Sequence, residues 1–149
     1  MTSFDFPHRV TYAETDKMGF VYYGNYMTYF EIGRTELIRS FGRPYIDLEN
    51  EGFYLPVIEV SCRYFKPARY DDLLAIRTEI TEFKGVRLGF KYEILRLVGW
   101  SRDGEKLAEG ATLHAFMDGQ GKPVRPPEWL KEMIKSSDET QDKTSPQMR

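Results

Sequence analysis

Apolar and polar positions alternate with a period of two in five stretches of the chain, the pattern of half-buried β-strands. The stretches cover residues 6–13, 58–64, 74–81, 86–94 and 106–117. The pairs Lys84-Gly85 and Asp103-Gly104 separate the last three stretches, and each offers a glycine that can adopt the positive φ of a hairpin turn. We therefore expect one N-terminal strand, followed later in the chain by four antiparallel strands.

Helical spacing replaces this alternation between the first and the second strand. Apolar side chains recur on one face from Tyr26 to Phe41, which predicts a long helix that begins near Asn25 and ends at Gly42. Gly33 lies on the same apolar face, although glycine inside a helix costs up to about 1 kcal/mol relative to alanine. We therefore expect Gly33 to mark a close approach of the helix to the sheet.

The remaining segments are short, and the end of the chain is polar. We expect a helical turn over residues 45–51 and an amphipathic helix that opens at Pro126 and ends near residue 136. Residues 1–136 then form one domain, and the polar residues 137–149 are predicted to be a disordered tail. The fold class is α+β, and a helix only about 25 Å long leaves sheet edges uncovered. Self-association would cover those edges.

Composition narrows the functional classes. Hydrophobic residues make up 41% and charged residues 30% of the chain, as in soluble globular proteins, and no apolar run approaches a membrane span. The formal net charge of −2 argues against general attraction to nucleic acid or anionic lipid. Cys62 is the single cysteine, and the first residues lack the pattern of a signal peptide, so we expect a cytoplasmic protein.

The stretch between the first strand and the long helix is where the sequence suggests chemistry. Asp16 stands shortly before the helix start, and Gly19 lets the chain fold back between them. Unpaired N–H groups at a helix start can stabilise developing negative charge, while a nearby carboxylate lies beside the same carbonyl. Taken alone, an aspartate in such a loop is more often a turn or capping residue.

A longer motif changes that weighting. The run Asp16-x-x-Gly19-x-Val21-Tyr22-Tyr23-x-Asn25-Tyr26, with Phe30-Glu31 and Arg34-Thr35-Glu36 after it, resembles the signature of the 4-hydroxybenzoyl-CoA thioesterase family. The resemblance implies a hot-dog fold, in which a curved five-stranded antiparallel sheet wraps a long central helix. It also implies dimers that join their sheets edge to edge, with active sites at the subunit interface.

The resemblance assigns roles residue by residue. Asp16 matches the catalytic aspartate, and the backbone N–H of Tyr23 matches the oxyanion donor. Many bacterial relatives carry histidine at the position of Tyr23, whereas the aromatic-acyl type can carry tyrosine. The other motif positions are predicted to bind substrate: Gly19, Tyr22, Gly24, Asn25 and Tyr26. Two basic groups are candidates for the coenzyme A phosphates: Lys84, Arg87 and Lys91 near one predicted hairpin, and Arg63, Lys66 and Arg69 near another. For each of these residues a solvated charged face is the simpler explanation.

The predicted function is hydrolysis of an acyl-CoA, with an aromatic or a short or medium acyl group, by a homodimer or homotetramer. Asp16 could attack the thioester or activate a water, and no metal ion or separate cofactor is expected. A hot-dog dehydratase would need a histidine beside its acid, yet His8 and His114 are distant from Asp16 in sequence. A non-catalytic protein that binds acyl-CoA or acyl carrier protein is the alternative from another class.

Overall fold

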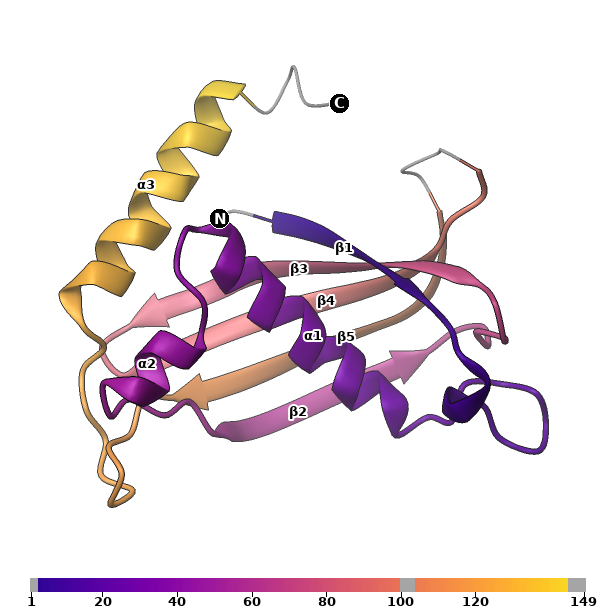
Figure 1. Ribbon diagram of the computed structural model, residues 1–149, viewed down its shortest axis with the longest axis horizontal. Helices are drawn as coiled ribbons and strands as arrows, with labels where there is room; N and C mark the ends of the chain where they lie inside the picture. The colour runs from indigo at the N-terminus through magenta and orange to yellow at the C-terminus, as the bar shows by residue number, and fades with distance from the viewer. Residues whose placement is uncertain (1–2, 100–103, 145–149) are drawn as a thin grey trace.

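A five-stranded antiparallel sheet curves around one central helix in the computed structural model, which describes residues 3–99 and 104–144 (Figure 1). The elements in chain order are β1 (Ser3–Arg9), the 3₁₀ turn η1 (Tyr12–Glu14), α1 (Asn25–Ser40), α2 (Ile46–Asn50), β2 (Val57–Tyr64), β3 (Leu73–Lys84), β4 (Arg87–Arg96), β5 (Glu105–Ala115) and α3 (Glu128–Thr144). The strand order is β1-β3-β4-β5-β2, and every neighbouring pair is antiparallel. The predicted α+β fold and its element order are confirmed.

Helix α1 lies on the concave face of the sheet and packs closely because of one residue. A Cβ atom on Gly33 would collide with the Thr78 hydroxyl and would stand 2.8 Å from a methyl group of Ile76, both on β3. One helical turn earlier, the ring of Phe30 stacks on Tyr92 of β4 with centroids 4.3 Å apart. The close approach predicted from Gly33 is confirmed, and it seats the apolar face of α1 in the core.

The first strand is shorter than its alternation predicted. β1 ends at Arg9 and Tyr12 opens the turn η1, where its side chain is 73% exposed. Val10 closes the pairing, since it exchanges backbone hydrogen bonds with Asp71 and Asp72. The chain must leave the sheet there to reach the start of α1, so the prediction of a strand up to Ala13 was wrong.

The alternation of apolar residues in β2 does not correspond to burial in a single copy of the chain. Its apolar residues alternate as in a half-buried strand, yet Ile58, Val60 and Tyr64 are all exposed by 44% or more. β2 is an edge strand. The contacts of α1 with the sheet are mainly to β1, β3 and β4, and α1 meets β2 at its first turn, where Tyr26 packs on Tyr64. The uncovered apolar edge predicted from the length of the helix is therefore present, and it is β2.

The last helix is longer than the sequence indicated. α3 continues to Thr144, so residues 137–144 are helical where disorder was predicted, and residues 145–149 lie outside the described part. Its first half is anchored to the body: Leu130 is fully buried, Trp129 donates a hydrogen bond to Glu51, and the Arg43 guanidinium lies 3.7 Å from the Trp129 ring. A helix nucleated by this packing can propagate into polar residues, a cooperative effect that composition alone does not reveal.

The two predicted hairpin turns have different outcomes. Gly85 has φ +61° and joins β3 to β4 as predicted. Asp103 of the second pair lies outside the described residues.

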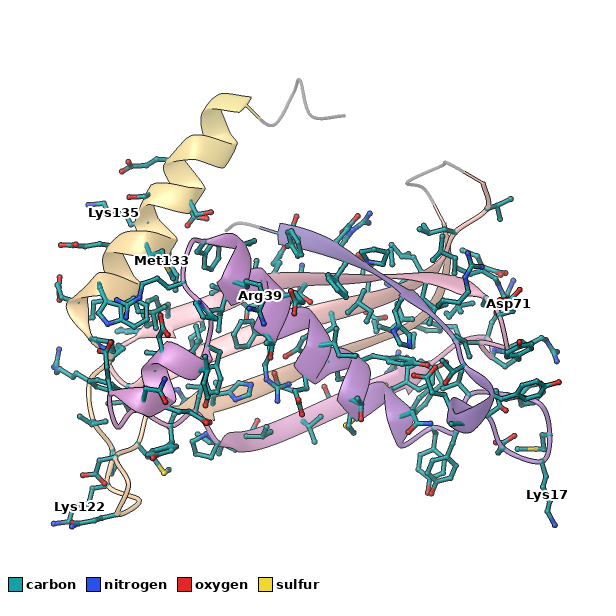
Figure 2. All side chains as sticks on the ribbon, in the orientation of Figure 1. Lys17, Arg39, Asp71, Lys122, Met133 and Lys135 are labelled. Carbon is teal, nitrogen blue, oxygen red and sulfur yellow. The ribbon has the colours of Figure 1, made fainter. Side chains whose placement is uncertain are left out.

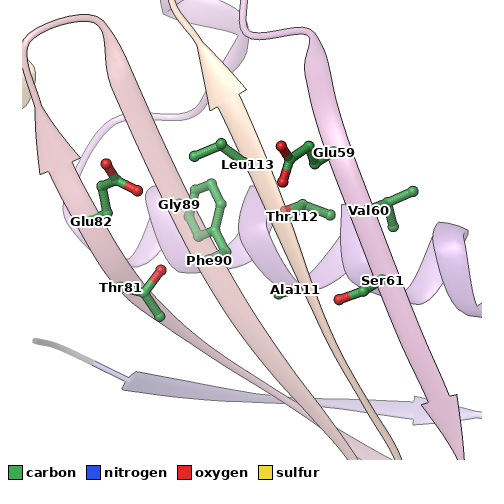
Figure 3. Close-up of a pocket in the computed structure, with 10 residues that line it drawn as sticks. All are labelled: Glu59, Val60, Ser61, Thr81, Glu82, Gly89, Phe90, Ala111, Thr112 and Leu113. Atoms are coloured by element: carbon green, nitrogen blue, oxygen red, sulfur yellow. The ribbon is translucent and has the colours of Figure 1, made fainter.

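The face of the sheet opposite α1 is polar. Cross-strand ion pairs such as Lys91–Glu79 and Arg77–Asp5 follow it, at 3.0 and 2.8 Å. A hollow of about 240 Å³ lies over β2, β3, β4 and β5 on this face, with Gly89 and Ala111 among its lining residues (Figure 3). Across residues 3–99 and 104–144, no helix has the length and apolar character of a membrane span.

Candidate active site

The loop between η1 and α1 is folded into a compact turn around Asp16. The Asp16 carboxylate oxygen Oδ1 accepts hydrogen bonds from the backbone N–H groups of Met18 at 2.9 Å and Phe20 at 3.3 Å. The Asp16 N–H donates to the Phe20 carbonyl at 2.8 Å, and Gly19 has φ +82°, which allows the chain to reverse. The side chain of Asp16 is thereby fixed in orientation. Among the described residues no donor contacts its other oxygen, Oδ2.

Two backbone N–H groups in front of α1 are also free. Tyr22 and Asn25 donate to Glu14 and Tyr22 respectively, but Tyr23 and Gly24 find no acceptor among the residues that the structure describes. The positive end of the helix dipole and these unpaired N–H groups together favour negative charge at this point. The backbone donor predicted for Tyr23 is thus available for a ligand.

Asp16 and Tyr23 line one groove. It has a volume of about 260 Å³ and runs between the loop and the segment that follows β2. Half of its described lining residues are aromatic: Phe20, Tyr23, Tyr26, Tyr64 and Phe65. Lys66 is the only positively charged member of the described lining, and it is paired with Glu105 at 2.6 Å. The groove can therefore hold an apolar or flat group beside a carboxylate.

Tyr64 is a site residue that the sequence did not single out. Its hydroxyl donates a 3.0 Å hydrogen bond to the Tyr23 carbonyl, and its ring meets the Tyr26 ring edge to face at 4.9 Å. Burial raises the pKa of the Tyr64 hydroxyl well above its usual range, so this donor keeps its proton. Tyr64 is 38 positions after Tyr26 in the chain, and no local motif links them.

Of the other residues predicted to bind substrate, some line the groove and others do not. Tyr26 is 2% exposed and lines the groove. Tyr22, Gly24, Gly19 and Asn25 are not among its described lining residues. The Asn25 side chain instead donates a 2.8 Å hydrogen bond to the Glu14 carbonyl, so it ties the start of α1 to the chain before Asp16.

Lys84 and Arg87 are not brought to the groove within one chain. They are cross-strand partners at the β3–β4 hairpin, at the end of the sheet opposite the loop (Figure 1). Lys17 marks the tip of the loop at the other end of the molecule (Figure 2). Arg87 is 3.3 Å from Glu82 on the neighbouring strand.

The surroundings of the two histidines indicate structural roles. His114 is fully buried, and burial lowers its pKa to about 4, so the ring is neutral. Its Nδ1 donates to the Leu55 carbonyl at 3.1 Å, which leaves Nε2 to accept from the Thr112 hydroxyl at 2.8 Å. His8 contacts Glu14. Neither lines the groove with Asp16, and within the described ranges no cluster of three metal-binding side chains exists.

This arrangement suits attack on a carbonyl carbon. A carbonyl bound with its oxygen toward the Tyr23 amide would have the developing oxyanion stabilised by a preorganised donor. Asp16 lines the same groove, and its Oδ2, which has no donor among the described residues, can act as a nucleophile or as a general base.

Comparison with known proteins gives one family. The model of the thioesterase superfamily matches residues 18–99. YneP of Bacillus subtilis is 34% identical over 117 residues, which are 78% of this chain and 81% of YneP. The acyl-CoA thioester hydrolase YbgC of Escherichia coli is 38% identical over 94 residues, 63% of this chain and 70% of YbgC. The solved DHNA-CoA thioesterase from Staphylococcus aureus has a TM-score of 0.81 at 27% identity and covers 100% of this chain and 97% of its own.

The family match covers more than half of the chain and includes the motif of the resemblance from Gly19 through Glu36, while Asp16 lies two residues before the matched range. The fold agrees over the whole chain with a solved thioesterase. Asp16 and Tyr23 line one groove, and sequence and fold lead to the same family. The chain belongs to the thioesterase superfamily, and its fold is the hot-dog fold.

Proposed function

We propose that this protein hydrolyses an acyl-CoA thioester to the free acid and coenzyme A. The observation that carries the proposal is the shared groove, which is lined by both Asp16 and Tyr23. Within the described part of the chain, one Asp16 carboxylate oxygen has no donor and the Tyr23 N–H has no acceptor. The activity named for YbgC, a 38% identical relative, supports the same reaction.

The chemistry needs few groups. The thioester oxygen accepts from the Tyr23 amide, and either Asp16 or a water activated by Asp16 adds to the carbonyl carbon. The carbon–sulfur bond then breaks, and the thiolate of coenzyme A leaves without a strong general acid, since thiol pKa values lie near 8.5. If Asp16 itself attacks, a water must afterwards hydrolyse the acyl-aspartyl anhydride. Both routes end in the same products and use no metal ion.

The groove also bears on the acyl group. Aromatic walls favour a flat ring or a short apolar chain over a long flexible chain, and about 260 Å³ limits the acyl length. The Staphylococcus aureus neighbour is named for an aromatic acyl-CoA. We propose that aromatic and short acyl groups are the substrates.

The test is a panel of thioesters with a thiol-reactive dye. Benzoyl-, hydroxybenzoyl-, butyryl-, octanoyl- and palmitoyl-CoA are compared, together with one good acyl group carried on acyl carrier protein. We expect thiol release from the aromatic or short acyl-CoA esters and the slowest release from palmitoyl-CoA. Saturable binding in calorimetry without any thiol release would contradict the proposal and identify a non-catalytic binding protein.

The functional unit is proposed to be a homodimer or a pair of such dimers. The apolar residues Ile58, Val60 and Tyr64 on the edge strand β2 are exposed. An exposed apolar edge strand can pair with a strand of another copy. Antiparallel pairing of two β2 strands would join the sheets of two copies. It would also turn the partner's β3–β4 hairpin toward the end that holds the Asp16 loop, where its Lys84 and Arg87 equivalents would meet phosphates.

A charge on the edge tests this assembly. Val60→Asp places two like charges near the centre of a paired β2 edge, so we expect a shift from dimer to monomer mass in light scattering. A monomeric wild type, or a Val60→Asp protein that stays dimeric, would contradict the edge pairing.

A further inference from the structure

A second carboxylate lies two residues before Asp16 and does not line the groove. Glu14 is the last residue of η1, and its side chain is 20% exposed. The thioesterase mechanism above gives it no chemical step. Its contacts nevertheless reach both ends of the loop that carries Asp16 and Tyr23.

The side chain of Glu14 is held from two directions. Oε1 accepts from the backbone N–H of Thr11 at 2.8 Å, which closes η1 on itself. His8 on β1 places Nε2 at 2.8 Å from Oε2 and 3.1 Å from Oε1. The His8 ring lies 5.0 Å from the ring of Tyr29, a fully buried residue of α1. Glu14 is thus fixed to the first strand, which is itself paired in the sheet.

The main chain of Glu14 is tied to the other side of the loop. Its carbonyl accepts two hydrogen bonds, one from the backbone N–H of Tyr22 and one from the Asn25 side chain, both at 2.8 Å. These donors flank Tyr23, whose amide is the oxyanion donor. One residue therefore connects the sheet, the chain before Asp16 and the start of α1.

We propose that Glu14, held by His8, is a positioning residue that sets the Asp16 carboxylate against the Tyr23 amide. The inference rests on the proposed thioesterase function and adds a residue to it. Glu14 touches neither the substrate nor the reacting atoms. Loss of its side chain frees the Glu14 carbonyl, and the Tyr22 and Asn25 donors bound to it, from their tie to β1, so the loop can shift. A misplacement of about 1 Å at a reacting group can cost on the order of 10²-fold in rate.

Kinetics of Glu14→Ala and Glu14→Gln test the proposal. Glutamine keeps an acceptor for the Thr11 N–H, and its amide can still hydrogen-bond to the His8 ring after a change of tautomer. We expect Glu14→Ala to lower kcat roughly 10- to 100-fold with KM within about threefold of wild type, since the groove wall is intact. Glu14→Gln should recover most of kcat, and amide exchange at Tyr22 should be faster only in Glu14→Ala.

Glu36→Ala is the matched control. Glu36 is similarly shielded, at 24% exposure, and pairs with Arg39 on α1 away from the groove. It should leave kcat and KM at wild-type values. Thiol release by the wild type in the same assay distinguishes the proposed thioesterase function from the positioning role of Glu14. A wild type without turnover would contradict the thioesterase function. A Glu14→Ala protein with full kcat beside an active wild type would contradict only the positioning role.

If the Glu14→Ala protein fails to fold, a second pair of variants tests the same positioning role. His8→Phe keeps a ring against Tyr29 but removes the donor to Glu14, and His8→Gln restores a donor. A kcat loss in His8→Phe that His8→Gln repairs, at constant KM, supports the proposal. Equal kcat in both variants and wild type overturns it.

Discussion

Two polar clusters in this chain contrast in how completely they are satisfied. In the sheet, Tyr92, Thr112 and His114 are each 5% exposed or less and form an unbroken series of hydrogen bonds that ends on the Leu55 carbonyl. At the loop, Asp16 is bonded through one oxygen only, and the neighbouring Tyr23 amide has no partner in the described structure.

The difference separates structural from chemical polar groups. A buried polar group without partners costs free energy, so the sheet cluster is complete and contributes to stability and a single core arrangement. Asp16 and Tyr23 line an open groove, where free hydrogen-bonding capacity costs little and can be used by a ligand. We therefore expect changes in the sheet cluster to affect stability and changes in the loop to affect turnover.

The largest stability effect expected is a pH dependence from His114. Burial lowers its pKa to about 4, whereas an unfolded histidine titrates near 6.5. Above pH 6.5 neither state binds the proton, so the contribution is fully present. As the pH falls from 6.5 to 4, the unfolded chain gains a proton that the folded state refuses, and the free energy of unfolding should fall by up to about 3 kcal/mol.

Urea unfolding at pH 7.5, 6, 5 and 4 measures this contribution, with His114→Gln as the reference. The difference between the two proteins removes the titration of the carboxylates that they share. A wild type whose pH dependence equals that of His114→Gln would show that the buried histidine is not neutral in the folded protein.

A smaller effect is expected from Tyr64, which belongs to the loop side of the contrast. Tyr64→Phe removes the hydroxyl that donates to the Tyr23 carbonyl and keeps the ring that packs on Tyr26. One hydrogen bond of this kind is worth about 1 kcal/mol, so kcat should fall roughly fivefold. Steady-state kinetics measure the change, and Tyr54→Phe, at an exposed tyrosine outside the groove, should leave kcat unaltered.

Much of the fold and the position of the candidate site could be predicted from the sequence. The periodicity predicted the number and order of the strands, the long helix and the packing role of Gly33, since these follow from local patterns, but it placed the end of β1 too late. The motif around Asp16 and Tyr23 located the loop, because its residue types are close together in the chain.

The parts that were missed depend on contacts between distant residues. Tyr64 reaches Tyr23 only after β2 is placed at the sheet edge, and Asn25 turns to the Glu14 carbonyl instead of the groove. The extension of α3 to Thr144 follows from the packing of its first half against the body, which polar composition at 137–144 conceals. The alternation of apolar residues also does not give the arrangement of the strands in space. It therefore did not show that the Lys84 hairpin lies at the end of the sheet opposite the Asp16 loop.

The most direct test of the account compares two isosteric changes, Asp16→Asn and Asp71→Asn, in the rate of thiol release from the best acyl-CoA of the panel. Asparagine at position 16 keeps an acceptor for the loop amides and loses the charge, so we predict a fall in kcat of roughly 10²–10⁴-fold without loss of folding. Asp71 is 71% exposed with φ +69°, a conformation asparagine tolerates, and its variant should match wild type. An Asp16→Asn enzyme that keeps the wild-type rate would contradict the central claim that this carboxylate performs the reaction.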